Sequence, residues 1–178
     1  MAYDPAATCP ADVRARASAV RLACFDVDGT LTDGRIILDG EGRETKCFHV
    51  RDGQGLALLR RAGIDVAFVT ARPGAVAARR AAELGVECHA EVGDKTAFVR
   101  DLAQRHGLAM DAVAFMGDDL ADLSVLRAAG FAAAPADAHA WILQHAHWRS
   151  TLPGGLGAAR EFCDLVLAAQ GRLQAYHA

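Results

Sequence analysis

The chain has 178 residues, of which 52% are hydrophobic and 23% charged, and its formal net charge at pH 7 is −3. This length fits a single domain with a substantial core, so the composition excludes a disordered chain. The 19 Lys and Arg nearly balance the 22 Asp and Glu. This balance excludes the basic stripe of a nucleic-acid binder and a polybasic membrane-binding surface.

Residues 1–19 are rich in alanine and contain two prolines, so we expect a loosely held arm with one short helix. Residues 20–178 contain no internal repeat and no low-complexity linker, which predicts one domain. Its first apolar run, residues 21–27, is short, contains Asp26 near its end and is followed by Asp28. This pattern is typical of a buried strand whose carboxyl end carries function.

Two strand-like runs at 35–39 and 43–50 flank Gly40-Glu41-Gly42 and predict a β-hairpin. Further along the chain, apolar strands alternate with amphipathic helices. The expected strands are 64–70, 86–90, 112–117 and 131–135, and the expected helices are 53–62, 74–84, 94–106, 119–129, 137–145 and 156–174. This alternation predicts an α/β fold, namely a Rossmann-like, doubly wound parallel sheet with helices on both faces and a hairpin flap after the first strand.

The N-terminus lacks the pattern of a secretory signal, and no apolar run approaches the about 18 residues of a membrane span. The five cysteines are odd in number and widely spaced, and no two form a C-x-x-C pair. This spacing argues against a disulfide framework or a structural zinc site. We therefore expect a cytoplasmic protein with reduced thiols.

Polar residues follow four of the expected parallel strands, at the edge where such sheets bind their ligands. Asp26 and Asp28 are two residues apart, so their side chains can project to the same side. The full set is Asp26 and Asp28 after the first strand, Thr70 after the second, Lys95 after the third, and Asp118, Asp119 and Asp122 after the fourth. We expect these acids, the hydroxyl and the ammonium to meet in one site.

Such an oxygen-rich cluster suits Mg²⁺, which takes few carboxylates and completes its shell with water and phosphate oxygens. The cation and Lys95 together turn an acidic site into one that attracts a phosphate dianion. One carboxylate can then attack phosphorus and form an aspartyl-phosphate. A second carboxylate can protonate the leaving oxygen and later activate water.

Four segments in this order resemble the motifs of the haloacid dehalogenase superfamily of phosphotransferases. They are FDVDGTL at 25–31, VTAR at 69–72, GDK at 93–95 and GDDLAD at 117–122. The resemblance implies that Asp26 is the nucleophile and that Asp28 is the general acid and base. It also implies that Mg²⁺ is bound by Asp26, by Asp118 and by the backbone carbonyl of Asp28.

By the same resemblance, Thr70 holds the phosphate, and Lys95 steadies the nucleophile and the transferring group. Asp119 and Asp122 are expected to orient the metal ligands without binding the metal themselves. In this superfamily, an acid at the position of Asp28 favours phosphatases over dehalogenases. The resemblance therefore predicts phosphate-ester hydrolysis.

Larger members of this superfamily carry a cap domain between their motifs. Here residues 34–69 are already filled by the hairpin and a helix, and residues 71–94 by a helix and a strand, so there is no room for a cap. A phosphatase nevertheless needs a site that is shielded from bulk water and shaped around its substrate. Either a macromolecular substrate or neighbouring subunits must cover the site.

Residues 21–174 as a whole are similar to the 3-deoxy-D-manno-octulosonate 8-phosphate phosphatase family. This closer resemblance is carried by FHVRDG at 48–53 and by GGLGAAREFCDLVLAAQG at 154–171. It implies a capless homotetramer in which hairpins and tails, here about 150–178, contribute to neighbouring active sites. It also implies hydrolysis of a phosphorylated eight-carbon keto-sugar acid on the route to lipopolysaccharide.

The implied substrate carries a carboxylate, which an arginine can bind as a bidentate pair. The residues expected to bind this substrate are Asp28, His49, Val50, Arg51, Asp52, Gly53, Arg72, Arg80 and Lys95. Arg80 falls in the middle of an expected helix, where an arginine is more often solvated. Whether Arg160 reaches a neighbouring site stays open at this point.

Three other functions also stay open. A phosphatase of a related nine-carbon keto-sugar-acid 9-phosphate shares this core. A non-catalytic regulatory domain of the superfamily has the same fold, although a binding module need not keep both Asp26 and Asp28. A protein or nucleic-acid phosphatase is disfavoured because the chain lacks a basic stripe.

Overall fold

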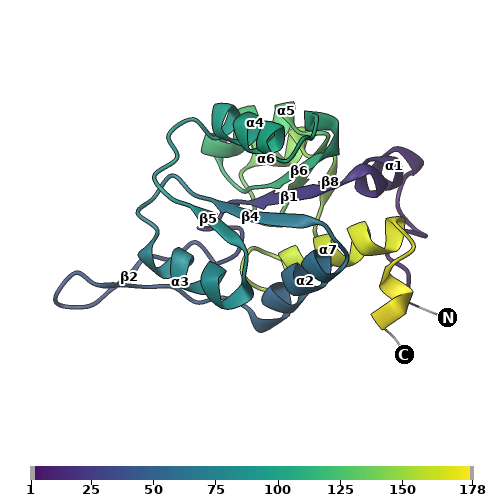
Figure 1. Ribbon diagram of the computed structural model, residues 1–178. Coiled ribbons are helices and arrows are strands. Elements are labelled where there is room, and N and C mark those ends of the chain that lie inside the picture. Colours follow the sequence, from purple (N-terminus) through teal and green to yellow (C-terminus); the bar gives the residue numbers. More distant parts are fainter. Residues whose placement is uncertain (1–2, 177–178) are drawn as a thin grey trace.

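The computed structural model describes residues 3–176, and a six-stranded parallel sheet lies at its centre (Figure 1). The strands are β1 (Leu22–Phe25), β4 (Asp65–Val69), β5 (Glu87–His89), β6 (Val113–Met116), β7 (Phe131–Ala134) and β8 (Trp148–Arg149). Their order is β5-β4-β1-β6-β7-β8, and every neighbouring pair is parallel. The expected doubly wound α/β fold is confirmed.

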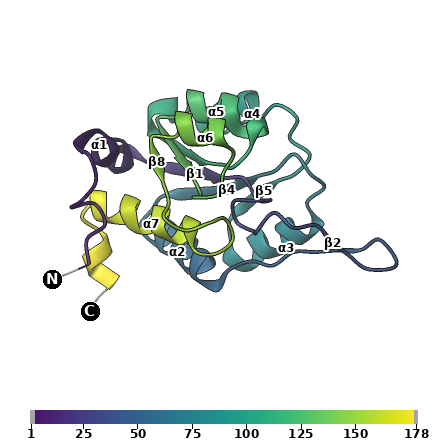
Figure 2. The ribbon, with the colours of Figure 1, turned by 180° about the vertical axis from the view of Figure 1, so that it is seen from behind.

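Helices cover both faces of this sheet, as Figures 1 and 2 show from opposite sides. One layer holds α4 (Lys95–Arg105), α5 (Leu123–Ala128) and α6 (Ala140–His145), and the other holds α1 (Ala11–Ala19), α2 (Val50–Arg61), α3 (Ala75–Leu84) and α7 (Ala158–Ala169). In β1, Ala23 and Phe25 join the core under α2 and α7, whereas Leu22 and Cys24 join the core under α4 and α5. Because both faces are buried, the strand reads as an uninterrupted apolar run.

Several element boundaries differ from the prediction. The expected helix 119–129 is split into a 3-10 turn, η2 (Leu120–Asp122), and α5, and the expected helix 156–174 ends early. It is followed by Gly171 at φ +67° and a further 3-10 turn, η3 (Leu173–Tyr176). A third such turn, η1 (Met110–Ala112), precedes β6, and β8 was not predicted because two residues carry no readable periodicity.

Helix α2 begins at Val50, three residues before the predicted helix and within the run of 43–50 that predicted a strand. His49 is its N-cap residue, and the His49 ring Nδ1 accepts a hydrogen bond of 3.2 Å from the backbone N–H of Arg51. A side chain that accepts from the first helical N–H groups is a standard start signal. The start was missed because residues 43–50 read as one strand-like run.

The hairpin flap is present after β1, with short antiparallel strands β2 (Ile37–Leu38) and β3 (Glu44–Thr45). Its tip projects away from the body of the molecule (Figures 1 and 2). Ile36, Ile37 and Leu38 are 60%, 44% and 59% exposed. An apolar stretch that is exposed on a projecting element is a candidate contact surface.

The N-terminal segment is not the loosely held arm that its composition predicts. It does contain the expected short helix, α1, but this helix packs against α7, with Val13 and Ala17 buried. The Tyr3 hydroxyl also donates a hydrogen bond of 3.3 Å to Asp164 Oδ2. The first two residues of the arm and the last two of the 150–178 tail lie outside the described residues. The domain boundary after residue 19 stays a prediction.

Among residues 3–176, no helix is long and apolar enough to cross a membrane. Over the same residues, the five cysteines are all free, and Cys24 and Cys163 are buried in the core. The absence of a disulfide framework agrees with the spacing of the cysteines in the sequence.

Candidate active site

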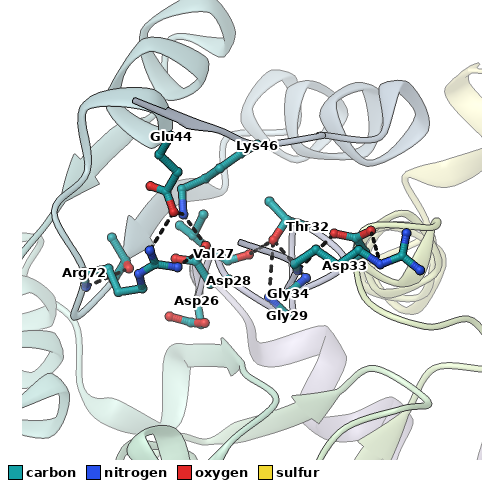
Figure 3. Close-up of polar contacts among 12 residues, drawn as sticks. Asp26, Val27, Asp28, Gly29, Thr32, Asp33, Gly34, Glu44, Lys46 and Arg72 are labelled. Carbon is teal, nitrogen blue, oxygen red and sulfur yellow. Dashed lines mark hydrogen bonds and ion pairs between the residues drawn. The ribbon is translucent and has the colours of Figure 1, made fainter. Parts of the chain in front are cut away.

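Asp26 and Asp28 lie just beyond the carboxyl end of β1, at the edge of the sheet (Figure 3). The chain then turns at Gly29, whose φ of +94° is in the region that favours glycine. A side chain at this position would place a Cβ 2.1 Å from Asp118 Oδ2. The glycine therefore lets the first motif approach the fourth one closely.

The structure brings Asp26, Asp118 and Asp122 together, so that one carboxylate oxygen of each lies within 4.8 Å of the others. Thr30 donates a hydrogen bond of 3.0 Å to Asp118 Oδ1 and so fixes one oxygen of that carboxylate. Clustered carboxylates with no His or Cys are the donors that Mg²⁺ prefers. Asp118 and Asp122 come from one loop and Asp26 from another, so the tertiary fold assembles this group.

The crowding of these acids is visible in their pKa values. Burial, and then the negative charge of Asp122, raise the pKa of Asp26 to about 6, although Lys95 opposes the shift. Burial, and then the charges of Asp26 and Asp122, raise the pKa of Asp118 to about 8. Carboxylates that are forced together in this way favour a bound cation, because it compensates their mutual repulsion. The residues therefore fit a divalent metal.

Lys95 is the cation that the chain itself supplies to this cluster. It is the first residue of α4, whose N-cap residue Asp94 accepts a hydrogen bond of 2.9 Å from the Ala97 backbone N–H. The Lys95 Nζ lies 2.5 Å from Asp26 Oδ1 and 2.6 Å from Asp122 Oδ1. Burial opposes the charged form of Lys95, but the two aspartates prevail and raise its pKa. The side chain is thus a fixed ammonium beside Asp26.

Asp119 and Asp122 have different structural roles, although the sequence predicted the same role for both. Asp119 is the N-cap residue of η2, where its Oδ1 accepts a hydrogen bond of 2.7 Å from the Leu120 N–H, and its side chain lies at the rim. Asp122 is buried, and its Oδ2 accepts a hydrogen bond of 3.1 Å from the backbone N–H of Asp118. Since its other oxygen contacts Lys95, Asp122 orients both Asp118 and the lysine.

Asp28 is contacted by Lys46 of the hairpin, which the sequence did not predict, and by Arg72, which it did. Lys46, which follows β3, donates a hydrogen bond to Asp28 Oδ1 (Figure 3). Arg72 Nη1 lies 3.6 Å from the same oxygen, and Arg72 Nη2 contacts Glu44 Oε1 at 2.6 Å. The composition offered a signal for Lys46. The chain contains only two lysines, and one of them lies in the hairpin.

An open cleft of about 310 Å³ lies over these groups. This volume is at the lower end of small-molecule sites, which range over roughly 300–1,000 Å³. The cleft is lined by Asp26, Asp28, Gly34, Thr70, Ala71, Arg72, Lys95, Asp118, Asp119, Ala121 and Asp122. The predicted catalytic residues thus share one cleft, and Thr70 is held there by a hydrogen bond of 3.2 Å from the Arg72 N–H to its Oγ1.

The other predicted substrate binders do not line this cleft in a single chain. His49, Asp52, Gly53 and Arg80 line a separate small cavity, while Val50 and Arg51 are exposed on the first turn of α2. Arg80 is tied to Glu83, with 2.8 Å between Nη1 and Oε2. Because these residues do not line the cleft of their own chain, their role in substrate binding stays a prediction.

Arg160 and the tail are also engaged within their own chain. Arg160 Nε lies 2.8 Å from Asp164 Oδ1, and Phe162 of the same helix is buried in the core. The glycine-rich segment that precedes α7 packs on the first motif, and Gly155 N–H donates a hydrogen bond of 3.0 Å to the Thr30 carbonyl. The tail therefore supports its own active-site loop, and a contact with a neighbour is not shown.

Comparison with known proteins agrees with this site. The haloacid dehalogenase-like hydrolase family matches residues 89–152. The 3-deoxy-D-manno-octulosonate 8-phosphate phosphatase KdsC of Escherichia coli (strain K12) is 41% identical over 165 residues, which cover 92% of this chain and 87% of the relative. The chain belongs to this family of phosphatases. The KdsC protein of Yersinia pestis is 40% identical and extends the match to 97% of this chain and 91% of the relative.

Solved structures give the same result for the fold. A hypothetical protein from Xanthomonas campestris is 52% identical with a TM-score of 0.97, and the match covers 99% of this chain and 97% of that one. The second structure is the 3-deoxy-D-manno-octulosonate 8-phosphate phosphatase of Moraxella catarrhalis in complex with a magnesium ion, a phosphate ion and a KDO molecule. It is 38% identical with a TM-score of 0.91, and the match covers 93% of this chain and 96% of that one. The predicted family, the fold and the hydrolase class are confirmed.

Proposed function

We propose that this protein hydrolyses 3-deoxy-D-manno-octulosonate 8-phosphate to the free sugar acid and inorganic phosphate. The observation that carries the proposal is the pairing of Asp26 and Asp28 at the end of β1, with Lys95 on Asp26, in a cleft of a member of this phosphatase family. Two carboxylates with different surroundings suit the two different roles that such a reaction needs.

In the first step, a carboxylate oxygen of Asp26 attacks phosphorus and the bond between phosphorus and the sugar oxygen breaks. Asp28 donates its proton to that leaving oxygen, which departs as the sugar hydroxyl. In the second step, Asp28 takes a proton from water as the water oxygen attacks phosphorus, and the bond to Asp26 breaks. Lys95 and the Thr70 hydroxyl stabilise the charge on the remaining phosphate oxygens in both steps.

The proposed cofactor is Mg²⁺, held by the carboxylates of Asp26 and Asp118 and the backbone carbonyl of Asp28. When bound, it neutralises phosphate and carboxylate charge and orients the phosphate for in-line attack. The acid cluster fits this ion, and the Moraxella catarrhalis relative is described with magnesium and phosphate. We assign the substrate carboxylate to Arg72, which is the predicted substrate arginine that lines the cleft.

A phosphate-release panel tests this function. We expect purified protein with Mg²⁺ to hydrolyse the octulosonate 8-phosphate faster than the nine-carbon 9-phosphate and faster than glycerol phosphate. EDTA should abolish release, and Asp26→Asn should lower kcat by at least about 10³-fold, because it removes a nucleophile that acts with its neighbours as a unit. Equal rates on all three esters would overturn the substrate assignment, and full activity of Asp26→Asn would overturn the mechanism.

We also propose that the active enzyme is a homotetramer that acts in the cytoplasm on a lipopolysaccharide precursor. The open cleft and the exposed apolar residues of the hairpin support an assembly in which neighbouring copies cover each site. His49, Val50, Arg51, Asp52, Gly53 and Arg80 would then bind substrate across a subunit boundary. The absence of a membrane-spanning helix among residues 3–176 is compatible with this location.

A further inference from the structure

The chain contains only two lysines, Lys46 and Lys95, and the other 17 of its 19 basic residues are arginines. Both lysine side chains are buried, with 2% of the Lys46 side chain and 4% of the Lys95 side chain exposed. Each contacts one of the two aspartates at the end of β1, since Lys95 binds Asp26 and Lys46 binds Asp28. Lysine is thus absent from the surface of this protein and occurs only beside its two catalytic carboxylates.

Lys46 and Glu44 come from the returning strand of the hairpin and reach back to the end of β1 (Figure 3). The Lys46 ammonium donates hydrogen bonds to Asp28 Oδ1 and, at 3.3 Å, to Glu44 Oε1. The same Glu44 oxygen binds Arg72 at 2.6 Å. A buried ammonium loses its hydration, so it stays charged only if carboxylates replace the lost water. Asp28 and Glu44 supply that replacement.

The two oxygens of Asp28 are therefore unequal. Oδ1 accepts a hydrogen bond from Lys46 and lies 3.6 Å from Arg72 Nη1, so it is engaged on the hairpin side. Oδ2 is buried and has no hydrogen-bond partner among residues 3–176. A carboxyl group that exchanges a proton with substrate must be held in the correct orientation. In this arrangement the contact of Oδ1 with Lys46 holds the Asp28 carboxyl group in one orientation.

We propose that Lys46 is a positioning residue for Asp28. By holding Oδ1, it fixes the rotamer of the Asp28 carboxyl group from which the proton passes to the leaving oxygen of the phosphate ester and to which the attacking water later gives its proton. Lys46 is not among the residues that line the cleft, so we assign it a role through Asp28 and not in contact with substrate. This inference deepens the proposed function and rests on it, because it assigns a cause to the orientation of the proposed general acid.

If Lys46 only fixed the hairpin on the domain, a different result would follow. Loss of that contact would lower the rates on all substrates alike or would lower the stability of the fold. Loss of orientation of a general acid affects esters with a poor leaving group most, because a good leaving group needs little protonation as the bond breaks. The leaving group therefore separates the two roles.

The experiment compares wild type, Lys46→Met and Lys46→Arg on the octulosonate 8-phosphate, an alkyl ester, and on p-nitrophenyl phosphate, whose leaving group is far less basic. Single-turnover rates at saturating substrate isolate the leaving-group step. We expect Lys46→Met to lower the alkyl-ester rate roughly 10–100-fold, the effect of a misplacement of about 1 Å, and to leave the aryl-ester rate within a few-fold. Lys46→Arg keeps the charge and should recover part of the loss.

Arg105→Met is the matched control, because it removes a cation from an exposed ion pair with Asp101 on α4, away from the cleft. It should leave both rates unchanged. Equal losses on both esters in Lys46→Met, or no loss on either, would overturn the role of Lys46. If wild type prefers no sugar-acid phosphate, the proposed substrate fails, and the alkyl-to-aryl ratio on glycerol phosphate still tests Lys46.

A spectroscopic measurement covers the case in which Lys46→Met does not fold. Protein labelled with ¹⁵N-lysine has two side-chain ammonium groups, because the chain has two lysines. We expect Asp28→Asn to shift the Lys46 resonance and to leave the Lys95 resonance in place, and Asp26→Asn to do the reverse. A Lys46 resonance that does not respond to Asp28→Asn would contradict the contact on which the inference rests.

Discussion

At the scale of single residues, Asp118 shows that the negative charges of this site destabilise the fold when no cation is bound. Its carboxylate is buried beside two other acids, and its pKa of about 8 lies far above the usual 3.8. In the unfolded chain the group loses its proton near pH 4, but in the fold it keeps the proton until about pH 8. The metal-free fold therefore loses stability as the pH rises through this window.

The prediction is that Asp118→Asn stabilises the metal-free protein at pH 8. In EDTA we expect its Tm to exceed that of wild type by roughly 2–4 °C, the shift that about 1 kcal/mol gives a domain of this size. At pH 4, where the wild-type carboxyl group is protonated in the fold, the two Tm values should converge. Scanning calorimetry at the two pH values measures this difference.

Mg²⁺ should reverse the order at pH 8. Wild type should gain stability as the metal is added, because ligand binding to the folded state raises Tm, whereas Asp118→Asn should gain little. A wild-type protein whose Tm does not depend on Mg²⁺ would argue against the proposed metal site.

At the scale of secondary-structure elements, Asp52 links α2 to the start of α7. Asp52 is 3% exposed, and its side chain accepts hydrogen bonds from the backbone N–H groups of Gly157, at 3.3 Å, and Arg160, at 2.8 Å. The first N–H groups of a helix have no partner within the helix, so a carboxylate from another element can cap them. FHVRDG and the glycine-rich tail, which carry the family resemblance, thus meet at this contact.

We expect Asp52→Ala to lower the free energy of unfolding by about 1–3 kcal/mol, because two buried N–H groups lose their acceptor. Urea denaturation measures this change as a lower midpoint. Asp101→Asn removes an acid from an exposed pair and serves as control, with an expected change within about 0.5 kcal/mol. If Asp52→Ala unfolds at the wild-type midpoint, Asp52 does not hold the two helices together.

At the scale of the whole molecule, the projecting hairpin and the open cleft are complementary features. The cleft has no cap, and three consecutive apolar residues of the hairpin, residues 36–38, are exposed. Burying such residues between subunits would gain about 25 cal/mol for each Å² removed from water. Assembly through the hairpin would also bring neighbouring residues closer to each cleft.

The double variant Ile36→Glu with Leu38→Glu tests this assembly. We expect light scattering to give a tetramer mass for wild type and a smaller mass for the variant, because buried like charges oppose association. Activity on the octulosonate 8-phosphate should fall about tenfold or more, which corresponds to about 1.4 kcal/mol of lost transition-state stabilisation. A monomeric wild type, or a fully active monomeric variant, would contradict the proposed tetramer.

The sequence by itself determined five of the six strands of the sheet, most of its helices and the cluster of acids. The strands β1, β4, β6 and β7 are nearly wholly buried, so their apolar runs were readable within one or two residues. Because the ends of parallel strands meet at one edge, the residues after them could be assembled into a site without coordinates. The order of the four motifs then pointed to the phosphatase family.

Only the tertiary structure decided the contacts between distant segments. Lys46 lies 18 residues from Asp28, and Asp52 lies 105 residues from Gly157, so no local periodicity links either pair. The short N-terminal helix was expected, but its packing on α7 was not, because only Val13 and Ala17 of it are buried, which is too little to produce an amphipathic pattern. The sequence specifies which groups are available for chemistry, whereas packing decides which side chain holds the Asp28 carboxyl group and through which oxygen.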